Sequence, residues 1–332
     1  MLALGMRQNQ NVFMQIKISQ ENLPLAKFMA GEASRLGLRL YAVGGCVRDW
    51  ILGSRVQDID FLASGPSDGL AEAVIARYGG KWQKFGSFQT ARCLTEKAGR
   101  IDIARFRRET YAAPAALPQT MPADTVEQDL LRRDFTVNAM AAELTGMDGA
   151  LAAITDISGG LEDLRSGIVR VLHKNSFRDD PTRIYRAARF AARFGWRLAP
   201  DTEEQAMQAV RAGLPGLLSR ERLRNELAKM LAEDNPARSL EMAAHLGAAD
   251  FIFPGMNAMA GRFGEIFAPG NNPPVPEQAE AAGGNAAVMR RFAALAQAIA
   301  PAGADFIVSL RLSKKQSREI ASIAGITLLG KH

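Results

Sequence analysis

The feature that most limits how this chain can fold is a change in the spacing of its apolar residues near Asp156. Before that point, short apolar runs that suit strands alternate with stretches of helical spacing. After it, apolar residues recur at three- and four-residue intervals only. The sequence therefore predicts an α+β organisation, in which an α/β part precedes an all-helical part. With 332 residues, 47% of them hydrophobic, the chain can bury a substantial core and form two or three domains.

The expected elements follow from this spacing and from the Gly and Pro residues that interrupt it. Strands are expected at residues 38–43, 59–63, 90–94, 100–106 and 139–144, and helices at 23–36, 47–52 and 70–78. Beyond Asp156, helices are expected at 181–194, 202–212, 221–231 and 237–245, and from 286 onward. Two stretches rich in proline predict loops: residues 108–129, as a mobile loop beside a catalytic site, and residues 269–285.

Charge and cysteine content narrow the class of protein. The formal charge is +6, and residues 165–229 hold 14 Lys and Arg against 7 Asp and Glu. This basic middle suits a partner that carries phosphate, although such an excess is also common in proteins that bind no nucleic acid. Cys46 and Cys93 lack the spacing of a zinc site or a disulfide framework, which favours a reducing cytoplasm. No apolar stretch approaches the roughly 18 residues that span a membrane, so neither export nor insertion is expected.

The segment from Tyr41 to Gly65 carries the first chemical signal. The diglycine Gly44-Gly45 follows a predicted strand and precedes a predicted helix. Such a turn lets the backbone approach a phosphate chain, and the first N–H groups of the helix favour negative charge. Arg48 is then expected to contact a triphosphate. Taken alone, the diglycine indicates only a tight turn.

Two acidic residues follow at the spacing of a strand. Asp58 and Asp60 flank Ile59, so period-two geometry places both carboxylates on one face. Such a pair can hold two divalent ions, which would lower the pKa of an attacking hydroxyl and neutralise a leaving pyrophosphate. Because all these ligands are oxygens, we expect two Mg²⁺ ions. A lone Asp-X-Asp is weak evidence, but its combination with the diglycine and Arg48 is specific.

Asp102 is a candidate third catalytic carboxylate. It alternates with Ile101 and Ile103, and so would lie on the opposite face of its strand from them. The alternative is a structural aspartate that is paired with an arginine.

Several motifs in order resemble those of class II tRNA nucleotidyltransferases (CCA-adding enzymes) and bacterial poly(A) polymerases. VGGCVRDWILG followed by DIDF resembles the first signature of that family. LLRRDFTVNAMA, residues 130–141, resembles the second, in which an arginine, an aspartate and an asparagine handle ribose and phosphates. The resemblance therefore assigns nucleotide binding to Arg133, Asp134 and Asn138. Residues 156–172 resemble the hinge between a catalytic head and a helical neck.

DDPTRIYRAARFAARF, residues 179–194, resembles the helix with which this family selects nucleotides, usually written EDxxR. A carboxylate and a guanidinium one helical turn apart can present an acceptor and donors to the edge of cytosine or adenine. Asp180 and Arg183 are the expected pair, while Asp179 replaces the usual glutamate.

The same helix carries a basic face. Its arginines fall within about a third of the helix circumference: Arg183, Arg186, Arg189 and Arg193. We expect this face to meet phosphate or base and to add Arg186 and Arg189 to the nucleotide site. A solvated face on a surface helix is the alternative.

The resemblance implies three parts: a nucleotidyltransferase-type head with a small mixed sheet at 22–150, a helical neck at 151–235, and a short helical body at 236–332. It implies an enzyme that adds or repairs the 3′-terminal CCA of tRNA from CTP and ATP without a template. A poly(A) polymerase or A-adding enzyme is the alternative. A non-catalytic RNA-binding protein is disfavoured because both Asp58 and Asp60 are present, and a small-molecule nucleotidyltransferase because of the EDxxR-like segment. The oligomeric state stays open, with a monomer as the simplest case.

Overall fold

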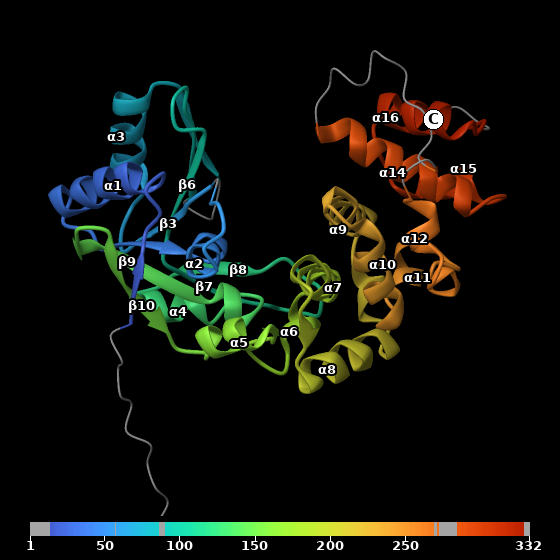
Figure 1. The fold of residues 1–332 in the computed structure, drawn as a ribbon, viewed down its shortest axis with the longest axis horizontal. Coiled ribbons are helices and arrows are strands. Elements are labelled where there is room, and N and C mark those ends of the chain that lie inside the picture. The colour runs from blue at the N-terminus through green and yellow to red at the C-terminus, as the bar shows by residue number, and fades with distance from the viewer. Residues whose placement is uncertain (1–13, 57, 86–89, 269–270, 272–283, 329–332) are drawn as a thin grey trace, which may run out of the picture. The chain divides into compact units, whose positions relative to one another are not determined.

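The structure, a computed structural model, describes residues 14–56, 58–85, 90–268, 271 and 284–328. The chain divides into two compact units. The first comprises Met1–Thr110 and Gln119–Leu164, and the second comprises Tyr111–Pro118 and Arg165–His332. A sheet with helices forms the first unit, and helices dominate the second (Figure 1). The predicted α+β organisation is confirmed.

A mixed sheet of eight strands organises the first unit, in the order β1-β10-β9-β2-β3-β6-β5-β4. Its strands are β1 (Gln15–Lys17), β2 (Leu40–Val43), β3 (Asp60–Ala63), β4 (Lys81–Phe85), β5 (Thr90–Leu94), β6 (Arg100–Arg105), β9 (Met140–Asp148) and β10 (Leu151–Asp156). Only β3 and β6 run parallel among these neighbours; the other pairs are antiparallel. The parallel pair aligns Asp60 with Asp102, which brings two of the predicted site residues to neighbouring positions.

Three helices of this unit match the expected helical spacing: α1 (Leu23–Arg35), α2 (Gly45–Ile51) and α3 (Asp68–Tyr78). Helix α1 buries Ala26, Met29 and Ala33, and it packs against β9, while α3 packs against β5. Small buried residues on α1 let its backbone approach the sheet closely. Removing this apolar surface from water stabilises the unit by about 25 cal/mol per Å².

The first unit extends past the predicted end of the head at residue 150. Strand β10 begins at Leu151 and pairs with β9, aligning Ile154 with Ala142. Helix α5 (Gly160–Ser166) follows, and the division between the units falls after Leu164. The hinge-like segment therefore begins as part of the sheet.

Residues 108–129 are not the irregular loop that their composition predicts. They contain β7 (Arg107–Thr110) antiparallel to β8 (Gln119–Pro122), and then α4 (Val126–Leu130). The fully buried Asp129 explains the order, because its carboxylate accepts hydrogen bonds from the backbone N–H of Arg107 and from the guanidinium of Arg132. Sequence spacing does not reveal these long-range polar bonds. The tip of the hairpin, Tyr111–Pro118, belongs to the second unit.

Helices expected in the second unit are confirmed, with a small addition. They include α6 (Ser176–Asp179), α7 (Thr182–Phe194), α8 (Pro200–Arg211), α9 (Arg220–Ala232), α10 (Pro236–His245), α11 (Ala249–Ile252) and α12 (Phe263–Ile266). Helix α7 packs against α9 and α10. The addition is a short parallel pair of strands, β11 (Ile168–Val169) with β12 (Arg197–Leu198), in a neck predicted to be all-helical.

The last part of the second unit contains α14 (Gly284–Ala298), α15 (Gly303–Ser309) and α16 (Lys314–Ala324). Helix α14 packs against both α15 and α16. The loop predicted at 269–285 lies almost entirely outside the described residues. Across the described residues, no helix combines the length and the apolar character needed to cross a membrane.

Candidate active site

The diglycine turn between β2 and α2 is shaped for close approach. Gly44 has φ 75°, a left-handed conformation that favours glycine, and its N–H donates to the Met140 carbonyl at 3.2 Å. A Cβ atom on Gly44 would lie 2.9 Å from Nη1 of Arg133 and 3.7 Å from the Asn138 carbonyl oxygen. The turn and the second sequence motif therefore meet, and the site requires glycine at this position for both reasons.

Arg48 joins the two motifs through hydrogen bonds. Its Nη1 donates to Oδ1 of Asn138 at 2.7 Å, and its Nε and Nη2 donate to the Asp49 carboxylate at 2.9 and 3.0 Å. Asn138 in turn donates from Nδ2 to Asp134 at 3.1 Å. Because Arg48 is only 4% exposed, it supports the turn from within the protein. The contact of Arg48 with a triphosphate stays a prediction.

Arg133 offers donors beside the turn. Its Nη2 donates to the buried carboxylate of Asp129 at 3.0 Å, whereas its buried Nε has no hydrogen-bond partner among the described residues. Burial raises the pKa of the Asp60 carboxyl group, and the positive charge of Arg133 opposes that rise. A phosphate oxygen would satisfy such a donor and neutralise part of the charge.

Asp58 and Asp60 lie on the same side of the extended segment, opposite Ile59. Ile59 is 3% exposed, whereas both aspartates are exposed, and this is the predicted alternation. Strand β3 begins at Asp60, so Asp58 lies two residues before that position and outside the strand. Burial by surrounding protein atoms raises the pKa of Asp60, and the charges of Asp102 and Asp58 raise it further. A cation at this position would relieve that repulsion.

Asp102 lies across from Asp60 in the sheet but has strong partners of its own. Nε and Nη2 of Arg92 donate to its two oxygens at 2.8 and 3.0 Å. Arg100 lies 3.6 Å from Asp102 and 3.7 Å from Asp58. This geometry matches the alternative of a structural aspartate that is paired with an arginine. The role of Asp102 as a third catalytic acid therefore stays a hypothesis.

The carboxylates fit magnesium only as a partial ligand set. Within the described residues, no three His, Cys, Asp or Glu side chains are grouped so that they could hold one metal ion. Mg²⁺ is commonly bound by one or two carboxylates, with substrate phosphates and water as its other ligands. The hard oxygens of Asp58 and Asp60 fit that arrangement, and repulsion between the nearby carboxylates favours a cation there.

In the second unit, Asp180 is fixed by one of its two oxygens. Oδ1 accepts hydrogen bonds from the Thr182 N–H at 3.0 Å, from the Thr182 hydroxyl at 2.6 Å and from Nη2 of Arg222 at 2.7 Å. Oδ2 accepts none from the described residues. The carboxylate is therefore held in one orientation with a single oxygen left as an acceptor.

Asp180 lies outside the helix on which it was predicted. It directly follows the last residue of α6, with φ −139° and ψ 94°, and α7 begins only after Pro181. The residue before a proline is driven from helical to extended conformation, which explains the break. Arg183 lies in the first turn of α7, is 5% exposed and donates to the Ser176 hydroxyl at 2.7 Å.

The basic face of α7 is less exposed than predicted. Nη1 of Arg189 donates to Glu233 at 2.8 Å, and its side chain is 11% exposed. The guanidinium of Arg186 lies over the Phe190 ring, 5.6 Å from its centroid. Of these residues, only Arg193 is largely exposed, because α9 and α10 pack against α7.

The sequence did not single out two residues, Arg222 and Ala115, that the structure connects with Asp180. Arg222 of α9 donates to Asp180 and, from Nη1, to the Ala115 carbonyl at 2.8 Å. Ala115, at the tip of the β7–β8 hairpin, has φ 61° and donates its N–H to the Arg178 carbonyl at 3.1 Å. Arg222 lies in SRERLRNELAKML, whose charges could equally have been structural. Nothing in the sequence links Ala115 to Arg222.

Two family profiles match the chain. The profile "Poly A polymerase head domain" matches residues 40–170, and "Probable RNA and SrmB- binding site of polymerase A" matches residues 197–259. The chain is 43% identical over 205 residues to an A-adding tRNA nucleotidyltransferase of Aquifex aeolicus. That match covers 62% of the chain and 24% of the relative. It is 38% identical over 226 residues to a multifunctional CCA protein of Neisseria gonorrhoeae, covering 68% of the chain and 52% of the relative.

Solved structures of CCA-adding enzymes have the same fold over nearly the whole chain. The Thermotoga maritima enzyme complexed with tRNA is 32% identical with a TM-score of 0.71, covering 93% of this chain and 71% of its own. A complex with ATP is 32% identical with a TM-score of 0.68, covering 94% and 67%. A complex with CTP is 32% identical with a TM-score of 0.67, covering 93% and 68%. The chain thus spans most of these solved chains, but only a quarter to a half of the two curated relatives.

Proposed function

The chain belongs to the family of poly(A) polymerases and CCA- and A-adding tRNA nucleotidyltransferases, and we propose that it builds or repairs the 3′-terminal CCA of tRNA. CTP and ATP are the proposed substrates, and no nucleic-acid template is used. The observation that carries the proposal is that Asp58 and Asp60 are both exposed, and that Arg133, which lies against the Gly44 turn, acts electrostatically on Asp60.

In the proposed reaction, the RNA 3′ hydroxyl attacks the α-phosphorus of the nucleotide. A new phosphodiester bond forms, the bond to pyrophosphate breaks, and the hydroxyl proton passes to solvent. Two Mg²⁺ ions would lower the pKa of the hydroxyl and neutralise the pyrophosphate. Asp58 and Asp60 would hold these ions, while the Gly44 turn and Arg133 orient the triphosphate. Asn138, fixed by Arg48 and Asp134, would contact the ribose.

Asp180 can account for a choice of cytosine and adenine. Both bases carry an exocyclic amino group, which donates hydrogen bonds, whereas uracil and guanine carry a carbonyl oxygen at the corresponding position. A carboxylate oxygen only accepts, so the unoccupied Oδ2 favours CTP and ATP over UTP and GTP. Arg183 would supply the donor of the pair after its guanidinium leaves Ser176.

Incubation with magnesium, labelled CTP and ATP, and tRNA that ends before CCA tests the proposal. We expect three nucleotides to be added, followed by arrest. Asp58→Ala and Asp60→Ala should abolish transfer and leave RNA binding nearly intact. No incorporation by the folded wild-type protein, under conditions in which a known CCA-adding enzyme works, would refute the proposal.

A-only addition is the second candidate, because a relative with 43% identity is an A-adding enzyme. The same assay separates the two functions by substrate. An A-adding enzyme extends only tRNA that already ends in CC, and it does so by one nucleotide from ATP. Long homopolymeric tails on unstructured RNA would instead identify a poly(A) polymerase.

A further inference from the structure

Asp129 is a fully buried carboxylate that directly precedes the second motif of the candidate site. A buried carboxylate is stable only where donors surround it. Its Oδ1 accepts hydrogen bonds from the Arg107 N–H at 3.2 Å and from Nε and Nη2 of Arg132 at 3.0 and 2.8 Å. Its Oδ2 accepts from Nη2 of Arg133 at 3.0 Å. The two oxygens therefore have different tasks: Oδ1 orders the start of the β7–β8 hairpin, and Oδ2 holds a residue of the candidate site.

The guanidinium of Arg133 depends on this carboxylate for its orientation. Among the described residues, Asp129 is the only group to which that guanidinium donates a hydrogen bond. Its Nη1 lies against the diglycine turn, where a Cβ atom on Gly44 would approach it to 2.9 Å. Because a guanidinium is planar and rigid, these two contacts also fix the direction of its remaining N–H groups.

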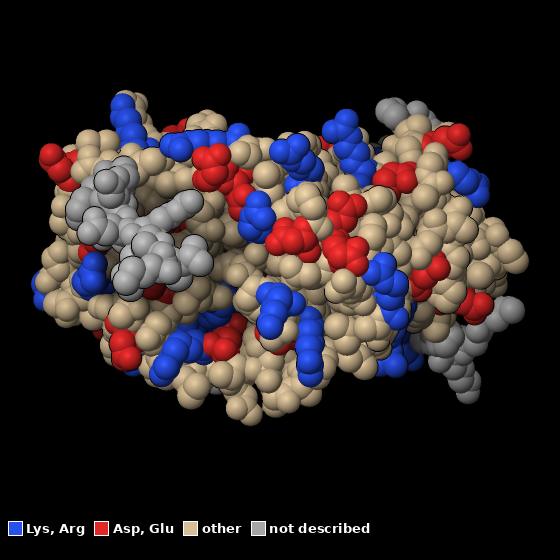
Figure 2. Space-filling model, turned by 90° about the horizontal axis from the view of Figure 1, so that it is seen from below, with Lys and Arg blue, Asp and Glu red and all other residues tan. Residues whose placement is uncertain are grey.

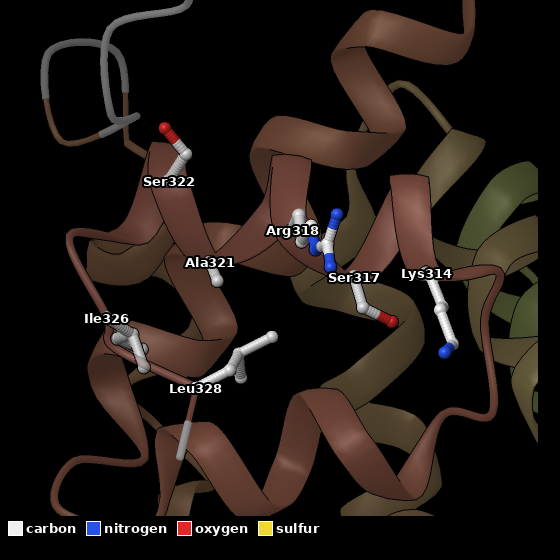
Figure 3. Close-up of a pocket in the computed structure, with 7 residues that line it drawn as sticks. All are labelled: Lys314, Ser317, Arg318, Ala321, Ser322, Ile326 and Leu328. Atoms are coloured by element: carbon white, nitrogen blue, oxygen red, sulfur yellow. The ribbon is translucent and has the colours of Figure 1, made fainter. Parts of the chain in front are cut away.

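Cations on the surface differ from Arg133 in how they are held. Lys314 and Arg318 border a cavity of about 410 Å³ at helix α16 (Figure 3), and both residues are exposed. On the face drawn in Figure 2, Lys and Arg are interspersed with Asp and Glu. Water and salt screen such charges, and their long side chains stay free to move. Arg133 is only 17% exposed and pairs with a fully buried carboxylate, so it keeps one orientation.

We propose that Asp129 is the residue that positions Arg133 for the triphosphate of the incoming nucleotide. The proposal rests on the proposed function, because it takes CTP and ATP as the ligands. A guanidinium that is fixed before the ligand arrives loses little freedom on binding, and it therefore binds phosphate oxygens more tightly than a mobile one. Asp129 is buried and acts through Arg133, so it is a positioning residue and not a catalytic one.

Asp129→Asn separates the two tasks of this side chain, because an amide has one acceptor oxygen where a carboxylate has two. That oxygen is expected to stay with the three donors of Arg107 and Arg132. The NH₂ group then faces Arg133, and donor meets donor. Equilibrium dialysis with labelled CTP and Mg²⁺ measures the result. We expect the Kd for CTP to rise about tenfold, while the Kd for tRNA changes by less than about twofold.

Glu109→Gln is the matched control. The Glu109 side chain is 7% exposed and accepts hydrogen bonds from Arg107 and Arg132 at 3.1 and 2.9 Å, whereas Arg133 makes no hydrogen bond to it. This variant removes a buried charge from the same network, so it should lower the melting temperature as Asp129→Asn does. The Kd for CTP should change by less than about twofold. Equal losses of CTP affinity in the two variants would overturn the proposal, because the network would then act only through stability.

A double-mutant cycle identifies the route by which Asp129 acts. In an Arg133→Gln background, Asp129→Asn should weaken CTP binding by less than about twofold, because the residue through which it acts is gone. A full tenfold loss in that background would contradict the positioning role.

Chemical rescue of Arg133→Ala leaves Asp129 unchanged, so it tests the proposal even if Asp129→Asn does not fold. Added guanidinium ion should restore CTP affinity by at least about threefold, because Oδ2 of Asp129 holds the ion where the side chain had been. Methylammonium has the same charge without the planar fork and should restore little. Equal rescue by the two ions would show that charge alone matters, and it would overturn the positioning role.

The binding assays are independent of catalysis. A protein that binds CTP in this pattern but transfers no nucleotide refutes the proposed function alone. No binding of CTP by the folded wild-type protein would overturn both proposals.

Discussion

Asp60 is exposed to solvent, yet its surroundings disfavour the charged form of its carboxyl group. It is exposed, but burial and the charges of Asp102 and Asp58 raise its pKa, against the lowering effect of Arg133. Asp60→Asn removes the repulsion and the cost of burying a charge. We expect transfer to fall on the order of a thousandfold, while the melting temperature stays the same or rises. Single-turnover assays and thermal denaturation of the same preparations measure both.

The pH dependence of that stability difference has a definite sign. An acid whose pKa is raised in the folded state contributes a destabilisation that is present above its folded pKa. The cost disappears as pH falls below its ordinary value of 3.8. Any advantage of Asp60→Asn should therefore be full at neutral pH and shrink on acidification. An advantage that grows toward low pH would contradict the assigned cause.

Variants of Asp102 and of its partner Arg92 distinguish a catalytic role of Asp102 from a structural one. If its main task is to pair with Arg92, then Asp102→Asn and Arg92→Gln should lower stability similarly, by about 1 kcal/mol for this half-exposed pair. Transfer would then fall only slightly in both variants. If Asp102 is the third acid, Asp102→Asn alone should lower kcat by at least about a hundredfold while Arg92→Gln does not.

Arg222 is expected to act through Asp180. Arg222→Gln removes the charged donor among the three that hold Oδ1, so the carboxylate is held less firmly and its open oxygen is oriented less well. We expect discrimination of CTP and ATP against UTP and GTP to fall by about tenfold, with a smaller loss of kcat for the correct nucleotides. Arg224→Gln is the control, since Arg224 lies on the same helix and donates to the Leu310 and Arg311 carbonyls. Equal losses in both variants would reduce Arg222 to a structural role.

At the scale of elements, apolar spacing predicted those helices and strands whose burial follows a simple period. Helices α1 and α7 and strands β5 and β6 lie within a few residues of their predicted positions. The β7–β8 hairpin could not be predicted in this way, because the buried carboxylate of Asp129 orders it through contacts distant in sequence. Apolar spacing and Pro181 predicted a helix that begins at residue 181, but the resemblance of the motif placed Asp180 on the same helix.

The tip of the β7–β8 hairpin contains a residue in a strained backbone conformation, Ala115. Substitutions at this residue test how strongly the tip is held in place. Ala115 has φ 61°, which costs a residue with a Cβ atom about 1 kcal/mol, and two hydrogen bonds hold it there. Ala115→Gly should keep both bonds and leave stability unchanged or slightly higher. Ala115→Pro cannot adopt this φ and loses the N–H donor, so we expect a loss of about 2 kcal/mol and faster proteolysis at the tip. Chemical denaturation and limited proteolysis measure these effects, and equal stability of the two variants would contradict the strain.

At the scale of the whole molecule, the change of apolar spacing near Asp156 predicted the two kinds of unit, but not where they divide. The division after Leu164 depends on the pairing of β10 with β9, and a strand of small and polar residues such as LAAITD gives a weak signal. The glycine turn at Gly44 and the exposure of Asp58 and Asp60 could be predicted, because turn and strand geometry depends on residues that are adjacent in sequence. The bond between Arg222 and Ala115 joins residues more than a hundred positions apart, and no local pattern encodes it.

The distribution of charge leads to a prediction that separates the two substrates. Residues 165–229 carry the excess of Lys and Arg, whereas the proposed triphosphate site depends on a few fixed groups, Gly44, Arg133 and the metal-binding aspartates. Raising KCl from about 50 to 200 mM should therefore raise the KM for tRNA far more than the KM for CTP. With four phosphate contacts, the expected loss of RNA affinity is on the order of a hundredfold. Initial rates at fixed free Mg²⁺ measure both constants, and equal salt dependence of the two would mean that the basic middle of the chain does not bind RNA.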